Sequence, residues 1–241
     1  NRCLTCRVKL ISEGFIVGKK FLFLIILLFF QTTLSFGETS DNKWRFAVYG
    51  GIQDVSSSKV KTFTDNGTSL DFDANWEGKS LSMPPYWGVR ASFWDTSSTA
   101  WEIDFVHSKA YATSSTLTDN GLEHFQFTDG VNVLSLSRIW QSENQIKARN
   151  LSPYIGVGGG VNLPYVEIIK TTTPSIARTM GYQFGGFSGQ IQAGVRYPVN
   201  PNLNAIFEYK ITYVALDVET SASKSLKTNL ITNAINIGVE F

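Results

Sequence analysis

The chain has 241 residues, of which 43% are hydrophobic, 13% aromatic and 17% charged, and its formal net charge is +1. A charge this close to zero gives no electrostatic basis for nucleic-acid binding, and apolar residues along the whole length argue against intrinsic disorder. The charged fraction also lies below the roughly 25% that is usual in soluble globular proteins.

Residues 1–37 are predicted to be an N-terminal extension followed by a cleaved signal peptide. Lys19 and Lys20 precede ten apolar residues, 21–30, and small residues follow at Ser35 and Gly37. Ten residues rise only about 15 Å as a helix, whereas a bilayer core is roughly 30 Å thick, so a transmembrane anchor is the less favoured alternative. We therefore expect export and cleavage after Gly37.

Cleavage there would change the charge and remove both cysteines. Five of the 21 basic residues and one of the 20 acidic residues lie in the removed segment, which leaves 16 basic and 19 acidic residues and a net charge of −3 in residues 38–241. Cys3 and Cys6 leave as well, so their spacing is interpreted neither as a redox motif nor as half a zinc site. Translation is expected to begin near Val17, since residues 1–16 resemble no export signal.

The second predicted domain, residues 38–241, alternates apolar and polar residues with a period of two and shows no sustained helical period. Eight segments have this pattern, an even number, and each is long enough to cross a membrane when tilted. The predicted strands cover about 44–53, 86–94, 100–112, 130–140, 155–165, 183–197, 203–218 and 231–241.

The connections between these strands alternate in length. The short ones are 95–99, 141–150 and 198–202, and the long ones are about 54–84, 113–129, 168–182 and 219–227. If the N-terminus enters from the periplasm, the short turns lie on the periplasmic side and the long loops lie outside, as in transmembrane barrels.

The two faces of the predicted strands differ in composition. One face carries four charges of each sign: Arg45, Arg90, Glu102, Asp104, Arg196, Glu208, Lys210 and Glu240. The other is apolar and has aromatic residues near its ends, which suits interfacial girdles: Trp44, Trp101, Trp140, Tyr197, Tyr213 and Phe241. The sequence therefore predicts an all-β fold, an eight-stranded antiparallel transmembrane β-barrel that resembles the OmpA and OmpX barrels, with the charges paired inside. Eight strands leave no open channel, which disfavours a diffusion pore.

Few compact chemical motifs stand out. The glycines of residues 156–160 lie within a predicted strand that no helix follows, so they are interpreted as making room inside a crowded barrel and not as a nucleotide loop. His124 lies beside Glu123 and near Asp129 in the second long loop. These three side chains are candidate ligands of a divalent cation, and a solvated polar loop is the plainer alternative.

His107 is the other histidine, and it shares the parity of Trp101, so we expect its side chain on the lipid face near the outer rim. Lys109 and Tyr111 share this parity and are placed to meet lipid phosphates. The alternative is that these amphipathic side chains simply lie at the headgroup boundary.

Several segments resemble the lipid A oxidase-like outer-membrane proteins of Rhizobium and related bacteria. They are residues 76–80, 84–90, 105–111, 127–132, 153–158, 208–210 and 226–234, which together span almost the whole predicted barrel. The resemblance implies an oxygen-dependent oxidation of the proximal glucosamine of lipid A to an aminogluconate unit. It implies molecular oxygen as a reactant and an unidentified cofactor, for which a divalent metal is one candidate.

The resemblance also implies a site at the outer rim. His107, with Glu77 or Asp129, would act as acid, base or metal ligand, and Lys109 and Lys227 would hold phosphates. Tyr111, Asn132 and Asn229 complete the expected substrate-binding set. We expect His107 and Asp129 to be brought together by neighbouring strands, with the remaining residues on the sector of the first, second and eighth strands.

The alternative function is a non-enzymatic barrel of the OmpA or OmpX type that serves envelope integrity or adhesion. It predicts polar external loops without a convergent set of functional groups. Under both readings the protein is an integral, monomeric outer-membrane protein that contacts outer-membrane lipids. Its terminal Phe241 is expected to be read by the outer-membrane assembly machinery.

Overall fold

The computed structural model describes residues 44–63, 69–142, 150–170, 182–220 and 223–241. The predicted signal peptide, its cleavage after Gly37 and the start near Val17 lie outside the described residues. Residues 43–241 form one compact unit. No helix in the described part of the chain is long and apolar enough to cross a membrane.

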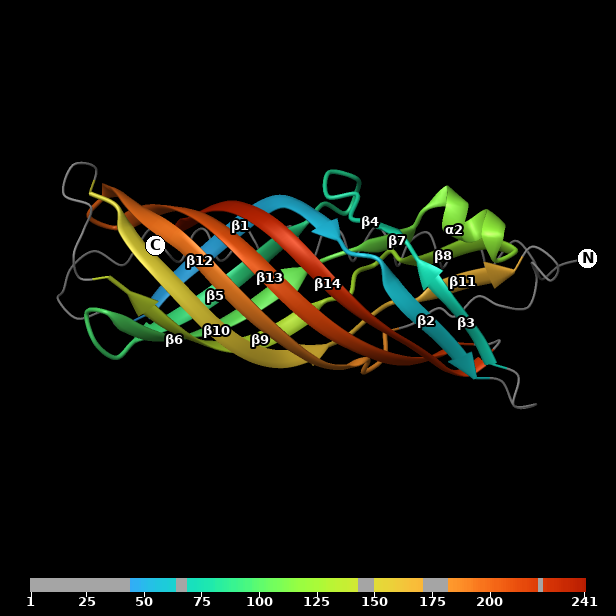
Figure 1. Cartoon of the computed structure of the whole chain (residues 1–241). Helices are drawn as coiled ribbons and strands as arrows, with labels where there is room; N and C mark the ends of the chain where they lie inside the picture. The colour runs from blue at the N-terminus through green and yellow to red at the C-terminus, as the bar shows by residue number, and fades with distance from the viewer. Residues whose placement is uncertain (1–43, 64–68, 143–149, 171–181, 221–222) are drawn as a thin grey trace, which may run out of the picture. The chain divides into compact units, whose positions relative to one another are not determined.

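Eight strands pair with their neighbours in an antiparallel ladder, and the first strand pairs with the last (Figure 1). This closed ladder is an eight-stranded antiparallel β-barrel, which confirms the predicted fold. Its strands, in spatial order, are β1 (Trp44–Val55), β5 (Trp87–Trp94), β6 (Thr99–His107), β9 (Val133–Gln141), β10 (Ser152–Asn162), β12 (Gly186–Asn200), β13 (Leu203–Thr220) and β14 (Ser223–Glu240).

Additional strands extend the barrel beyond its wall at one end. β2 (Ser58–Phe63) pairs with the start of β14, and β3 (Ser69–Ala74) pairs with β2. A separate four-stranded sheet has the order β11 (Glu167–Lys170), β8 (Leu122–Phe127), β7 (Ala110–Ala112) and β4 (Trp76–Glu77). The short helix α2 (Ser114–Asp119) joins β7 to β8, and Thr113 caps its first turn. The predicted long loops thus hold much of their own secondary structure.

Two predicted boundaries are wrong. The third predicted strand, 100–112, is broken at Ser108 and Lys109, where the chain leaves the barrel and enters the four-stranded sheet. The eighth strand starts at Ser223 and not at Ile231, so 219–227 is the tip of the β13–β14 hairpin and not a long loop. The extension of β14 was missed because its outer face there carries polar residues such as Lys227 and Asn229. At this level β14 lies beyond the apolar belt, so its outward side chains are not apolar.

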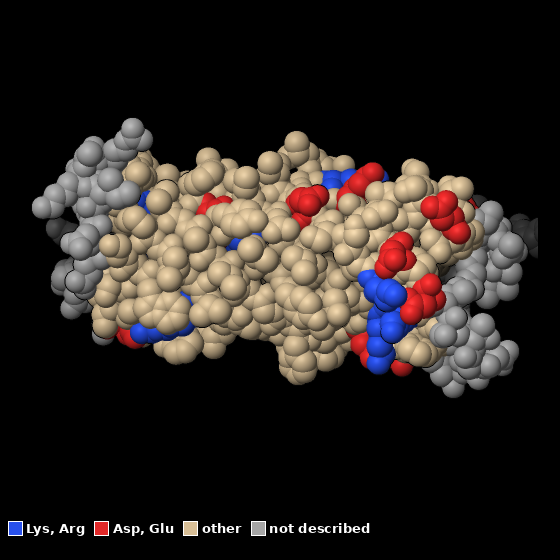
Figure 2. Space-filling model, viewed as in Figure 1, with Lys and Arg blue, Asp and Glu red and all other residues tan. Residues whose placement is uncertain are grey.

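The outer face of the barrel is an apolar belt. Exposed side chains on this belt include the aromatic residues predicted for the girdles: Trp44, Trp101, Trp140, Tyr197, Tyr213 and Phe241. In the view of Figure 2 most of the charged side chains gather toward the end that carries β2 and β3. An outer surface that is apolar over the closed ladder and charged beyond it is the pattern of a barrel that spans a membrane.

The barrel interior holds the predicted charges in pairs. Arg90 donates two hydrogen bonds to the carboxylate of Glu208, at 2.8 and 2.9 Å, and its Nε lies 3.6 Å from Glu102. Lys210 donates to Asp104, and Arg196 donates to Glu240 at 3.1 Å. All seven of these charges are buried, whereas Arg45 lies half exposed at the rim, 3.3 Å from Glu240. Balanced pairing satisfies buried charges that would otherwise be costly.

The glycines of β10 make room for this interior. A Cβ on Gly160 would lie 2.0 Å from the carbonyl oxygen of Leu134, and one on Gly158 would lie 2.1 Å from Ser137 Oγ. The close approach explains why these positions carry no side chain. Among the described residues, β10 is followed by the strand β11 and not by a helix that would make a nucleotide loop.

Candidate functional site

The predicted site lies where the barrel wall gives way to the four-stranded sheet. β6 ends at His107, and after Ser108 and Lys109 the chain continues as β7, which pairs with β4 and β8. β6 and β9 are neighbours, as predicted, so the segment before β9 returns beside His107. The residues of this junction therefore come from segments far apart in sequence.

His107 is buried, with only 6% of its surface exposed. Its ring stacks on Trp87 at a centroid distance of 6.1 Å. Gly130, at φ +98°, passes so close that a Cβ there would lie 2.5 Å from His107 Nδ1. The prediction that His107 faces lipid is wrong. The alternation along the strand places His107 on the outer face, but the segment 130–132 covers its side chain there.

The hydrogen bonds of Asn132 fix the tautomer of His107. Asn132 Nδ2 donates to the carbonyl oxygens of Asp129, at 2.9 Å, and Leu163, at 3.3 Å. Its Oδ1 therefore faces His107 Nδ1, at 2.8 Å, and accepts the ring proton. In the neutral ring the lone pair is then on Nε2, which is buried and has no hydrogen-bond partner among the described residues. Such a nitrogen can act as a base or as a ligand.

Lys109 is fully buried, and its ammonium group is turned toward the protein. Nζ donates to the carbonyl oxygen of Ser82 at 2.8 Å and lies 5.5 Å from the ring centre of Tyr111. Burial, with a smaller contribution from Lys79, lowers the pKa of Lys109. The prediction that Lys109 meets lipid phosphates is therefore wrong, because a side chain without exposed surface cannot reach them. The alternative, a side chain at the headgroup boundary, is wrong for the same reason.

Glu77 lies beside Tyr111, its partner in the β4–β7 pair. Its carboxylate is half exposed and lies 3.5 Å from Lys79 Nζ, which in turn lies 4.5 Å above the ring centre of Tyr111. Glu77 thus lies on the His107 side of the rim through β7, while the next residue, Gly78, is bound by Gln53 of β1, which agrees with the expected place beside the first strand. The alternation of strands could not show this, because β4 pairs within the separate sheet.

Asp129 is exposed, and it is the backbone carbonyl oxygen of this residue that forms the local hydrogen bonds. That oxygen accepts hydrogen bonds from Asn132 Nδ2 and from Tyr182 Oη, the latter at 3.2 Å. Its position beside the covering segment confirms that the Asp129 and His107 segments meet.

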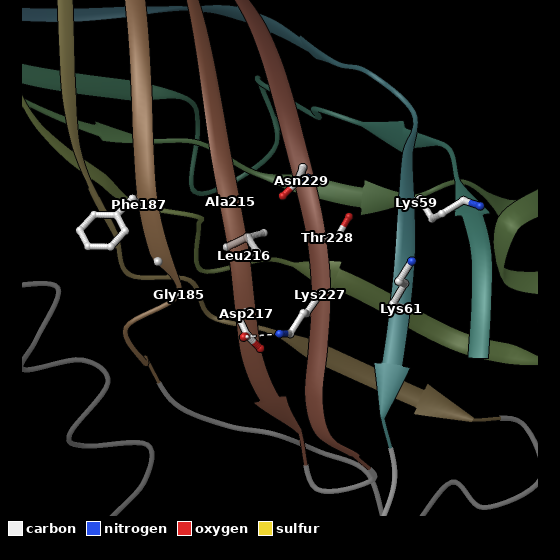
Figure 3. Close-up of a pocket in the computed structure, with 11 residues that line it drawn as sticks. Lys59, Lys61, Gly185, Phe187, Ala215, Leu216, Asp217, Lys227, Thr228 and Asn229 are labelled. Carbon is white, nitrogen blue, oxygen red and sulfur yellow. Dashed lines mark ion pairs between the residues drawn. The ribbon is translucent and has the colours of Figure 1, made fainter. Parts of the chain in front are cut away.

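Lys227 and Asn229 line a hollow of about 510 Å³ on the outer face of β2, β14, β13 and β12. Figure 3 shows Lys227 paired with Asp217 on the adjacent strand, at 3.1 Å, with Lys59 and Lys61 on β2 alongside. Lys59 and Lys61 lie 3.5 and 3.9 Å from Asp71. Sequence reasoning missed both lysines, although the alternation of Lys59, Val60 and Lys61 within a predicted loop was a signal of a strand.

The loop candidate for a divalent cation is not assembled. His124 is exposed on β8, with Nε2 3.8 Å from Glu123. Over the ranges of the chain that the structure describes, no three His, Cys, Asp or Glu side chains gather as a cation site.

Gln53, on β1, was missed as the residue that ties the junction together. Its Nε2 donates to the carbonyl oxygens of Lys109, at 2.6 Å, and Gly78, at 3.3 Å, while its Oε1 accepts from Ser108 Oγ at 2.8 Å. Nothing in the sequence distinguishes it from other inward-facing polar residues.

The closed ladder, its charged interior and its apolar belt define the class of protein: an eight-stranded transmembrane β-barrel. No protein-family model and no curated protein sequence matches this chain.

Solved structures with some similarity are surface and outer-membrane barrels of bacteria. Neisserial surface protein A is 14% identical, with a TM-score of 0.47, over 84% of this chain and 98% of that chain. OprG from Pseudomonas aeruginosa is 14% identical, with a TM-score of 0.41, over 82% and 95%. The attachment invasion locus protein Ail of Yersinia pestis is 11% identical, with a TM-score of 0.39, over 83% and 99%. The fold assignment rests on the strand ladder itself.

Proposed function

We propose that this chain is an outer-membrane barrel that oxidises the proximal glucosamine of lipid A to an aminogluconate unit. The sequence resemblance supports this reaction, and one structural observation favours a chemical role: the buried Nε2 of His107, which no described residue engages. The Nδ1 hydrogen bond to Asn132 holds that nitrogen in its basic form. Lipid A lies in the outer leaflet, and the junction is at the barrel end that bears the added strands.

The proposed reaction starts from a glucosamine whose C1 hydroxyl is free. Two electrons and two protons pass from the C1–OH group to molecular oxygen, which gives a lactone and hydrogen peroxide. Water then opens the lactone, so the product gains one oxygen atom. His107 Nε2 would accept the hydroxyl proton once the substrate displaces the segment 130–132 that covers the ring, with Glu77 or Asp129 proposed as a second acid or base. Transfer to oxygen needs a cofactor.

Substrate contacts are proposed for the exposed residues. Lys227, Asn229, Lys59 and Lys61 surround a hollow beyond the apolar belt, the level at which lipid phosphates lie. Tyr111 remains a proposed substrate-binding residue on the His107 side. Asn132 was also expected to bind substrate, but it is buried and its amide group already binds His107, Asp129 and Leu163, so its proposed role is to position His107. Lys109, which is buried, is proposed to hold the His107 side of the rim in place through its hydrogen bond to Ser82.

We also propose the location and the assembly route. An apolar belt around a barrel with a charged interior suits integral placement in the outer membrane, as a monomer in contact with its lipids. Phe241 exchanges two backbone hydrogen bonds of 2.8 Å with Phe46 and leaves its ring partly exposed. An aromatic residue directly after the closing strand β14 is a suitable signal for the assembly machinery.

A non-enzymatic envelope or adhesion barrel is the second candidate. It is favoured by the pairing of charges around the rim, where Lys227 is matched by Asp217 and Lys59 by Asp71. In that case β2, β3 and the β13–β14 hairpin are a rigid surface projection and the hollow is one of its features.

Mass spectrometry of lipid A from cells that express the barrel tests the proposal. Cells with the wild type are expected to yield lipid A heavier by one oxygen, and cells with His107→Ala are expected to yield unmodified lipid A. His124→Ala is the matched control, since this histidine is exposed on β8, and it should retain the modification. Each variant is first checked for folding by its mobility in unheated gel samples.

Unmodified lipid A from oxygenated, metal-supplemented cells with folded wild-type barrel would reject the oxidase function and leave the envelope or adhesion role. Retained modification by His107→Ala would reject the role of His107.

A further inference from the structure

The loop of residues 78–86, here called the rim loop, presents two bare apolar side chains. Leu81 is 82% exposed and Met83 is 83% exposed, the highest values among the large hydrophobic residues that are described. The side chains of the apolar belt itself are less exposed than these, because their neighbours on the strands cover part of them. Exposed apolar side chains on an ordered loop call for a partner.

The rim loop is held in place from three sides. Within it, Ser82 N–H donates to the carbonyl oxygen of Lys79 at 3.0 Å, and Tyr86 N–H donates to that of Ser80 at 2.8 Å. Ser80 Oγ accepts from the backbone N–H of Gln53 at 2.8 Å. Lys109 Nζ reaches the carbonyl oxygen of Ser82, between the two apolar residues, at 2.8 Å. A buried ammonium group thus fixes the tip of the loop.

The attachment point lies within the apolar belt. Gln53 follows Ile52, whose side chain is 57% exposed and whose partner on β14 is Ile235. The belt continues farther outward along β14 to Ile231, whose carbonyl oxygen accepts from Ser56 N–H. In Figure 1 the loop between β4 and β5 projects sideways from the barrel wall and not along its axis. Its tip is therefore directed toward the surroundings of the belt.

We infer that the rim loop inserts Leu81 and Met83 into the outer leaflet as a lateral membrane anchor. The occupant is acyl chain, because the belt beside the loop is the surface that already faces lipid. Lys79, half exposed at the base of the loop, has a side chain long enough to extend its ammonium group toward lipid phosphate while the apolar tip enters the hydrocarbon. In this arrangement Lys109 is a positioning residue for the anchor.

Depth-dependent fluorescence quenching tests this anchor in the full chain. Cys3 and Cys6 are replaced by Ser, single cysteines are introduced as Leu81→Cys or Met83→Cys, and each is labelled with an environment-sensitive fluorophore. The labelled barrels are placed in phosphatidylcholine vesicles that carry nitroxide quenchers high or low on the acyl chain. Both labels are expected to emit to the blue and to be quenched several-fold more strongly by the shallow nitroxide than a label in water.

Two positions calibrate the experiment. Ile52→Cys on the belt reports lipid contact, and Asp119→Cys at the end of α2 reports an external aqueous position. Labels at 81 and 83 that behave like the label at 119 would overturn the anchor. Quenching by aqueous iodide in place of lipid nitroxide, or disulfide-linked dimers through Met83→Cys, would overturn it in favour of solvent or of a second copy.

Lys109→Met examines the positioning role in the same vesicles. Loss of the Ser82 contact is expected to reduce lipid quenching at residue 83 while the label at Ile52→Cys is unchanged. Unaltered quenching would show that Lys109 does not position the tip. The labels in the otherwise unchanged chain decide the anchor itself, even if this variant does not fold.

Discussion

Arg90→Met is expected to destabilise the barrel by about 3–5 kcal/mol, the usual cost of breaking a buried ion pair from one side. Its guanidinium group forms a two-pronged contact with Glu208 and lies 3.7 Å from Asp104 at Nε. Without it, Asp104 and Glu208 share the single charge of Lys210, and Glu102 keeps its hydrogen bonds to Ser92 and Gln192. The measurement is guanidinium unfolding in lipid vesicles, followed by tryptophan fluorescence.

Arg138→Met is the matched control. Arg138 forms an ion pair with Asp95, with 2.8 Å between the two charged groups, beside the short turn after β5. Both side chains are partly exposed there. A pair of this kind contributes only about 0–1 kcal/mol. Equal losses for the two variants would contradict a stabilising role for the interior network.

Ile191→Arg on the belt is expected to cost about 2–4 kcal/mol, the price of an arginine facing lipid near the bilayer midplane. Ile191 is 60% exposed and lies between Val157 and Ile211, its partners on the two adjacent strands. Its neighbours on the belt are also apolar, so the new charge finds no partner there. The same unfolding assay measures the effect.

Tyr197→Arg supplies the depth control on the same strand and the same face. Tyr197 lies beside the short turn that joins β12 to β13, where an arginine should cost only about 0–1 kcal/mol. A gradient between the two positions identifies the belt as the membrane-spanning surface. If both substitutions cost the same, the level assigned to the bilayer is wrong.

Much of the barrel follows from alternation along the sequence. Strands such as β13 show one apolar and one polar side chain in turn, so Phe207 and Lys210 could be assigned to opposite faces without a structure. The balance of charges then indicated that the polar face was the enclosed one. Arg90, Glu208 and Lys210 are buried and paired, as predicted.

The external part was predicted poorly for a physical reason. Strands outside the membrane meet water on one side and the protein on the other, so Lys59 and Lys61 look like loop residues when the chain is read alone. The alternation along a strand also predicts on which face a side chain lies, but it does not predict which other residues cover that side chain. His107 and Lys109 were expected at the lipid surface, and residues far away in sequence, 130–132 and Ser82, bury them.

The pairing of β1 with β14 has a consequence for biogenesis. Partners such as Ala47 and Glu240 come from opposite ends of the strand order, so this seam cannot form until the whole barrel sequence has been delivered. Until then both terminal strands present open edges, which invite pairing with other chains. The closing step therefore forms the strand pair with the largest sequence separation among the described residues, and it is the slowest to find by diffusion of the chain. A barrel of this kind therefore depends on partners that shield its open strand edges until the last strand is available to pair.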